Sequence, residues 1–99
     1  MLNSKQRAKL RGIASTEPTI FQLGKDGITE NFIKSVDTAL TARELIKFKV
    51  LENAMLDRRE AAEEIAKATN SEVVTVIGTK IVLYRPAEKD EDRRYPKVI

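Results

Sequence analysis

The sequence predicts an α/β fold, a single compact domain in which helices pack on a four-stranded mixed sheet. The chain has 99 residues, too few to build two separate hydrophobic cores. Its composition, 41% hydrophobic and 33% charged residues, is typical of a foldable globular domain. Segments with helical periodicity alternate with short segments rich in β-branched residues, which gives the element order α-β-α-β-α-β-β.

The first expected element is a helix from Ser4 to Ala14, because Asn3 and Gln6 have the spacing of a capping box. Its apolar stripe consists of Leu10, Ile13 and Ala14. Its charged residues are all basic and lie on the two flanks of that stripe: Lys5, Arg7, Lys9 and Arg11. Such charges can simply solvate a surface helix. A helix built for solubility usually mixes the signs of its charges, so the absence of an acid favours a surface that faces a polyanion.

The central stretch combines a strand, a glycine turn and a second helix. Pro18 excludes helix, and strand-forming residues follow it, so a strand is expected over residues 19–23. The turn follows directly as Gly24, Lys25, Asp26 and Gly27. Thr29 has the position of the N-cap of a helix that runs to about Ala42. The apolar stripe of this helix consists of Phe32, Ile33, Val36, Ala39 and Leu40.

Three interpretations of the turn are open. Two glycines in a turn are common, so the simplest is a structural role. Nucleotide binding is disfavoured, since the turn has neither the GxxxxGK[ST] nor the GxGxxG pattern. The third is a clamp for a nucleic-acid backbone, as the GXXG loop provides in KH domains. Backbone N–H groups and Lys25 would then meet the phosphates and Lys34 would extend the contact, while Glu30 would compete with a bound phosphate.

A second strand is expected from Glu44 to Leu51. Ile46, Phe48 and Val50 point to one of its faces. Lys47 and Lys49 point to the other, where they either protect a sheet edge or extend a basic surface. Asn53 to Leu56 is expected to be a connector.

The last third of the chain predicts a helix and a hairpin. Asp57 and Glu60 signal a helix that runs to about Thr69, with a mostly acidic outer face. Its expected buried stripe is Ala61, Ala62, Ile65 and Ala68. Strands over 72–77 and 80–84 flank a Gly78-Thr79 turn, and both are apolar on both faces, with Val74 and Val76 expected on the same face. The two long helices can cover only one face, so the N-terminal helix is expected to cover part of the other.

Charge and residue usage limit the function classes. Lysine and arginine number 18 and aspartate and glutamate 15, a net charge of +3 that is concentrated in the first half of the chain. Cysteine and histidine are absent, and no serine lies in a nucleophile motif, so no enzyme activity, metal or cofactor is expected. No segment is apolar enough to be a signal peptide or to span a bilayer, which makes a cytoplasmic protein the default expectation. Residues 1–86 are expected to form the domain and 87–99 a charged, flexible tail.

Four segments resemble, in order and spacing, the single-domain YhbY-like members of the CRM family, named for chloroplast RNA splicing and ribosome maturation. They are LNSKQRAKLRGIA, PTIFQLGKDGIT, ELIKFKV and VIGTKIVLYRP, and the resemblance covers about residues 2–86. It implies an RNA-binding fold similar to the C-terminal domain of bacterial initiation factor three. It places the RNA-contacting loop on Gly24, Lys25, Asp26 and Gly27 with Thr29 opening the helix, and a basic surface on Lys5, Arg7, Lys9 and Arg11. Asp26 departs from the small or neutral residue that many relatives carry.

The expected function is therefore binding of ribosomal RNA in precursor particles during assembly of the large (50S) ribosomal subunit. Lys34, Lys47 and Lys49 are expected to extend the RNA surface of a monomer that has no small-molecule substrate and no membrane partner. The alternative is a protein-interaction adaptor that acts on the ribosome or on a ribosome-associated GTPase without recognising RNA directly.

Overall fold

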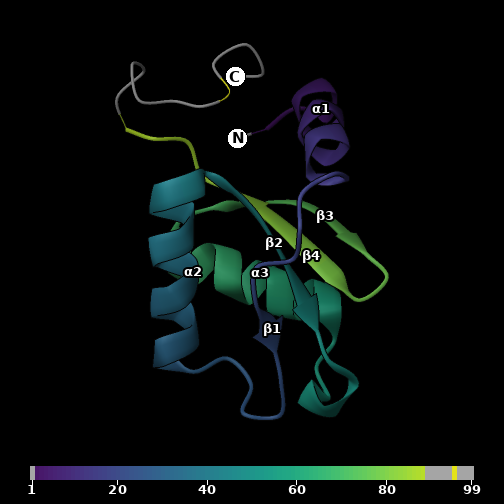
Figure 1. The fold of residues 1–99 in the computed structure, drawn as a ribbon, viewed down its shortest axis with the longest axis vertical. Coiled ribbons are helices and arrows are strands. Elements are labelled where there is room, and N and C mark those ends of the chain that lie inside the picture. Colours follow the sequence, from purple (N-terminus) through teal and green to yellow (C-terminus); the bar gives the residue numbers. More distant parts are fainter. Residues whose placement is uncertain (1, 89–94, 96–99) are drawn as a thin grey trace.

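The computed structural model describes residues 2–88 and 95 and confirms the predicted α/β fold, with three helices on one four-stranded mixed sheet. Its elements in order are α1 (Ser4–Ala14), β1 (Gln22–Leu23), α2 (Glu30–Arg43), β2 (Leu45–Val50), a 3-10 turn η1 (Glu52–Ala54), α3 (Arg58–Thr69), β3 (Glu72–Ile77) and β4 (Lys80–Tyr84). The strand order is β1-β2-β4-β3 (Figure 1). β1 runs parallel to β2, whereas β4 is antiparallel to both β2 and β3.

Hydrogen bonds of side chains fix where the helices begin. The Asn3 side chain accepts from the N–H of Gln6, and the Gln6 side chain accepts from the N–H of Asn3, so the predicted capping box is complete. Thr29 caps α2 through the N–H of Phe32, and Asp57 caps α3 through the N–H of Glu60. These caps satisfy amides that have no partner within the helix, which is why all three helix starts could be predicted.

Two hydrophobic cores lie on opposite faces of the sheet. The larger one joins α2 and α3 to the sheet through residues such as Val36, Leu40 and Ile65, which meet Phe48 and Leu83. Three phenylalanine rings, of Phe21, Phe32 and Phe48, pack together with centroids 5.5–5.6 Å apart. The smaller core lies under α1, as expected from strands that are apolar on both faces. Its members include Leu10, Ala14, Leu45, Val82 and Tyr84.

A β-bulge in β3 corrects the expected alternation of that strand. Val73 pairs with Leu83 and Thr75 pairs with Val82, so Val74 is an additional residue with no partner of its own on β4. Val74 is buried in the core under α1, whereas Val76 packs against the larger core. The prediction that both valines share a face is therefore wrong, because a bulge shifts the alternation by one residue.

Further details of the elements differ from the sequence prediction. β1 contains only Gln22 and Leu23, although Ile20 already donates to the carbonyl of Lys47 at 2.9 Å. Glu44 has φ 64° and ψ −45° and ends α2 instead of starting β2, because this positive-φ backbone conformation redirects the chain. In α3 the buried positions include Ala66 and Thr69 instead of Ala68. The buried face of this helix is thus rotated slightly about the helix axis relative to the predicted stripe. The expected connector over residues 53–56 includes part of the η1 turn.

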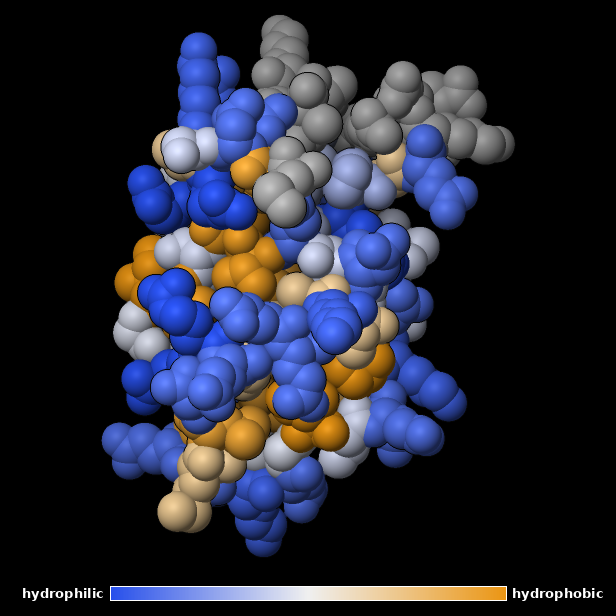
Figure 2. All heavy atoms as spheres, turned by 180° about the vertical axis from the view of Figure 1, so that it is seen from behind, coloured by the Kyte–Doolittle hydropathy of each residue, from blue (hydrophilic) through white to orange (hydrophobic). Residues whose placement is uncertain are grey.

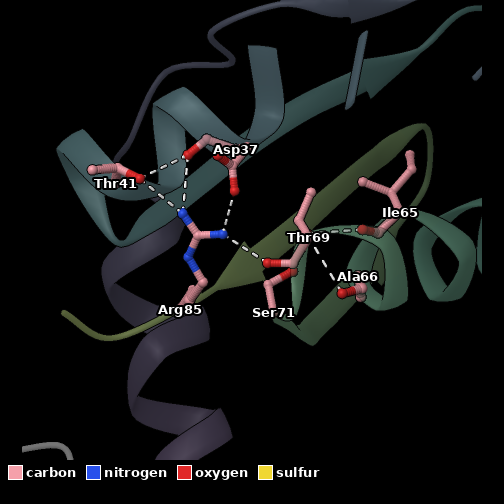
Figure 3. A network of polar contacts seen from close by, with 7 residues as sticks. All are labelled: Asp37, Thr41, Ile65, Ala66, Thr69, Ser71 and Arg85. Carbon is pink, nitrogen blue, oxygen red and sulfur yellow. Dashed lines mark hydrogen bonds and ion pairs between the residues drawn. The ribbon is translucent and has the colours of Figure 1, made fainter. Parts of the chain in front are cut away.

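Arg85, directly after β4, ties α2 to the end of α3 (Figure 3). Its guanidinium donates to Asp37 Oδ1 at 2.6 Å, to Thr41 Oγ1 at 2.9 Å and to the carbonyl of Thr69 at 2.7 Å. A fourth bond reaches the carbonyl of Asp37 at 3.0 Å. One planar side chain therefore fixes the distance between the two helices that cover the larger core.

The predicted tail lies largely outside the described residues, since positions 89–94 and 96–99 are not among them. Tyr95 is described, and its ring centroid lies 6.4 Å from that of Tyr84. Among the described residues, no helix combines the length and the apolar character needed to cross a bilayer.

Candidate nucleic-acid interface

The glycine turn joins β1 to α2 and closes on itself. The N–H of Gly27 donates to the carbonyl of Gly24 at 3.0 Å. Gly27 has φ 73°, a conformation that residues with a Cβ adopt only with strain, although no neighbouring atom would meet a Cβ there. At Gly24 a Cβ would touch the side chain of Leu51 at 3.7 Å, an ordinary contact. Backbone conformation therefore requires a glycine only at the second of the two positions.

The side chains of this turn point to solvent at the N-terminus of α2. Lys25 and Asp26 are both exposed, so the turn presents one positive and one negative charge. Thr29 uses its hydroxyl to accept from the N–H of Phe32 at 3.0 Å, which occupies one of the free amides. Glu30 lies in the first turn of α2, and Lys34 is exposed one turn further. The positive potential of the helix end is thus partly offset by two acids.

The basic residues of α1 lie mostly on its solvent side. Lys5, Lys9 and Arg11 are exposed, and α1 contains no acidic residue. Arg7 is half-buried, and its Nε donates to the carbonyl of Val73 at 3.3 Å. Three of the four predicted cations are therefore available to a ligand, and the fourth also helps to hold α1 against β3.

The two lysines of β2 differ in their surroundings. Lys47 Nζ donates to the carbonyl of Ala14 at 2.7 Å and so binds the C-terminal end of α1. Two N–H donors of this ammonium remain for other partners. Lys49 is half-buried and borders a hollow together with Glu52 and Thr79. The structure thus gives Lys47 a structural role that the sequence did not predict, and an RNA contact of either lysine stays a prediction.

Lys80 was missed from the sequence and lies directly opposite Lys49 on β4. The N–H of Val50 donates to the carbonyl of Thr79 at 2.7 Å, which makes those two residues a hydrogen-bonded pair. The adjacent pair of lysines is consequently of the non-hydrogen-bonded type, in which side chains approach most closely. Like charges in this arrangement destabilise a sheet, so an anion between them would relieve the repulsion. Only the strand register could have revealed this pair.

The turn and the basic helix do not form one compact patch. Figure 1 shows α1 near one end of the long axis and the connection from β1 to α2 at the other, with the sheet between them. Seen from behind, the middle of the molecule, where α3 lies, carries mostly hydrophilic side chains (Figure 2). The exposed charges of α3 balance, since three acids, Glu60, Glu63 and Glu64, are matched by three bases, Arg58, Arg59 and Lys67. A face without net positive charge does not attract a polyanion, which leaves the side of the sheet that carries α1 and the rim near the turn.

Residues 2–85 match the model of the CRS1 / YhbY (CRM) domain family. The chain belongs to this family. It is 42% identical over 96 residues to the "Probable RNA-binding protein YqeI" of Bacillus subtilis, which covers 97% of this chain and 100% of that one. It is 34% identical over 88 residues to the "RNA-binding protein" of Haemophilus influenzae, covering 89% of each chain. The resemblance drawn from the four sequence segments is thus confirmed.

A solved structure extends the likeness to three dimensions. The solution structure of the hypothetical protein SAV1595 from Staphylococcus aureus is 47% identical and has a TM-score of 0.79, over 95% of this chain and 98% of that one. The CRM fold of this chain therefore matches an experimentally determined relative over nearly the whole length. The relatives named above are described as RNA-binding proteins and not as enzymes.

Proposed function

We propose that this CRM domain protein is a non-catalytic RNA-binding protein of the cytoplasm. Its RNA would be ribosomal RNA in precursor particles of the large (50S) subunit. The observation that carries the proposal is the acid-free α1, whose Lys5, Lys9 and Arg11 are exposed. Such a surface attracts phosphates, and the RNA-binding relatives in the same family support RNA as the polyanion.

The glycine turn is the second proposed contact. Backbone N–H groups near Gly27, together with Lys25, would bind a sugar-phosphate segment as the loop of KH domains does. Lys34, Lys47, Lys49 and Lys80 would add charge along the α2 rim and on the sheet. The large separation of α1 and the turn means that one RNA would contact both only if it extends along the molecule. The target is therefore a structured RNA rather than a single short loop.

Binding to a fragment of 23S ribosomal RNA precursor tests this function. Affinity measured by fluorescence anisotropy should fall steeply with salt, since each phosphate contact releases counterions. The double variant Lys9→Ala, Lys25→Ala should bind more weakly and with a salt slope smaller by about 2. The variant Lys67→Ala, which removes a cation from the charge-balanced surface of α3, is the matched control and should bind like the native protein. Absence of salt-dependent RNA binding, with salt-insensitive binding to a ribosomal protein or a GTPase, would favour the adaptor function instead.

A further inference from the structure

A groove of about 580 Å³ runs between α2 and the two residues, Ile20 and Phe21, that directly precede the edge strand β1. Ile20 and Phe21 line one side of it, and α2 forms the other side from Asn31 in its first turn to Arg43 in its last. Twelve residue steps of 1.5 Å give the helical wall a length of about 18 Å. The groove therefore extends along nearly the whole length of α2.

The helical wall of this groove combines small and uncharged polar side chains with two basic residues. Asn31, Ser35, Thr38 and Ala42 follow a spacing of four, three and four residues, which places them on one face of α2. The Ser35 hydroxyl is used within the helix, where it donates to the carbonyl of Asn31 at 3.0 Å. The Asn31 amide and the Thr38 hydroxyl make no side-chain hydrogen bond to any described residue. They are therefore available to a ligand that carries its own donors and acceptors.

The opposite wall is apolar and rigid. Phe21 is held by ring contacts to both Phe32 and Phe48, each with centroids 5.5 Å apart, so its position is set by the larger core. Ile20 is fixed by its backbone bond to Lys47. A flat ligand with an apolar face would be bound here without rearrangement of the protein, which reduces the entropy cost of binding.

All charged residues that line the groove are basic. They are Lys34 and Arg43, both exposed, and the one ion pair found among the described residues, between Arg85 and Asp37, involves neither of them. Lys34 also borders a second hollow that is lined by Glu30 and Glu64. Arg43 stands apart from these acids at the far end of the groove. The groove consequently favours a ligand that carries negative charge over an apolar peptide that has no acidic residues.

We propose that this groove binds an unpaired segment of RNA, with a base against Ile20 and Phe21, its polar edge toward Asn31 and Thr38, and a phosphate on Arg43. This inference rests on the proposed RNA-binding function and specifies which part of the RNA is bound. A base in a duplex is stacked and its edge is paired, so it cannot offer both an apolar face and free polar groups. The groove therefore selects single-stranded nucleotides that adjoin the structured element held elsewhere.

The test is an NMR titration of the full-length protein with hexauridylate, a single-stranded probe, and separately with a blunt RNA duplex. Hexauridylate should shift the amide signals of Phe21, Thr38 and Ala42, and the duplex should leave them unchanged. The variant Arg43→Gln should weaken hexauridylate binding about three- to tenfold, because a phosphate contact is lost. The matched control is Lys67→Gln, which removes the last-turn cation of α3 and should change the affinity by less than about twofold.

Other outcomes separate this inference from the function on which it rests. The ribosomal RNA fragment could bind with steep salt dependence while hexauridylate leaves the amide signals of Phe21, Thr38 and Ala42 unchanged. In that case the assignment of the groove as an RNA site is wrong and the proposed function stands. If an acidic peptide shifts those signals and hexauridylate does not, the groove is a protein-binding site and the inference is overturned. If no RNA of either kind binds at low salt, both proposals fail.

Discussion

Lys47 on β2 donates a hydrogen bond from its ammonium to the carbonyl oxygen of Ala14, the last residue of α1, at 2.7 Å. The same carbonyl accepts from the N–H of Glu17 at 3.0 Å. A lysine at the C-terminus of a helix also interacts favourably with the helix dipole. A residue expected to contact RNA therefore positions α1, the acid-free helix on which the proposed RNA binding mainly rests.

Replacement of Lys47 by methionine should lower the free energy of unfolding by about 1–2 kcal/mol, because a charge-assisted hydrogen bond is lost while the aliphatic stem remains. Urea denaturation followed by circular dichroism measures the change. The control is Lys49→Met. Lys49 faces Lys80 across the sheet, so its replacement should leave stability unchanged or raise it by a few tenths of a kcal/mol. Equal losses in the two variants would contradict the structural role of Lys47.

Arg85→Lys should destabilise the protein by about 1–2 kcal/mol, because a single ammonium cannot reach Asp37, Thr41 and the carbonyl of Thr69 at once. The ion pair itself contributes little, since the Asp37 side chain is 58% exposed and its charge is screened by solvent. The greater part of the loss should come from the hydrogen bond to Thr69, which is partly buried.

Thermal melting can separate these contributions. Asp37→Asn removes the charge of the pair and should shift the melting temperature less than Arg85→Lys does. Arg59→Lys, an exposed arginine at the start of α3, should not shift it measurably. A larger effect from Asp37→Asn would mean that the charge, and not the bond to Thr69, holds α2 against α3.

Gly27→Ala should cost about 1–2 kcal/mol, since an alanine must adopt the φ of 73° that closes the turn. Gly24→Ala should be close to neutral, because its Cβ would make only ordinary contacts with Leu51 and Asn53 and no positive φ is involved. Chemical denaturation of both variants provides the comparison. A loss at Gly24 as large as that at Gly27 would show that the space beside the turn, and not its backbone conformation, requires glycine.

The helices could be predicted from the sequence because their signals are local. The Asn3–Gln6 capping box, the Thr29 cap and the apolar spacing of α2 each lie within a few residues, and the structure confirms all of them. The apolar character of β3 and β4 on both faces also predicted correctly that α1 covers the sheet. The second hydrophobic core thus follows from two features: strands that are apolar on both faces and the right-handed crossover connections between strands.

The details that escaped prediction depend on pairing between distant residues. The bulge at Val74 arises from the register of β3 on β4, and hydrophobic alternation cannot reveal it when both faces are apolar. The contact of Lys47 with Ala14 spans 33 positions, and the juxtaposition of Lys49 and Lys80 depends on strand order. The groove beside β1 likewise combines α2 with residues that precede it by about ten positions or more. Individual cations could be identified from the sequence, whereas the residues that lie next to them in space could be identified only from the fold.

The distance between the glycine turn and α1 leads to a prediction about the size of the RNA. Lys25 and Lys9 lie on elements at opposite ends of the molecule, so they should contact different phosphates. On a long structured RNA, the binding losses of Lys25→Ala and Lys9→Ala should add to within about 0.5 kcal/mol in the double variant, as expected for distant sites. Each single substitution should also reduce the salt slope by about 1.

A short hairpin cannot reach both ends, so on this probe only one of the two substitutions should reduce affinity. Calorimetry of the native protein, both single variants and the double variant against both RNAs completes the comparison. Strong coupling of the two substitutions on the long RNA would have one of two causes. Either the RNA folds back so that its contacts with Lys25 and Lys9 depend on each other, or both lysines contact the same phosphate. Either result would contradict an RNA that extends along the molecule from α1 to the turn, because independent contacts at the two ends must be lost independently.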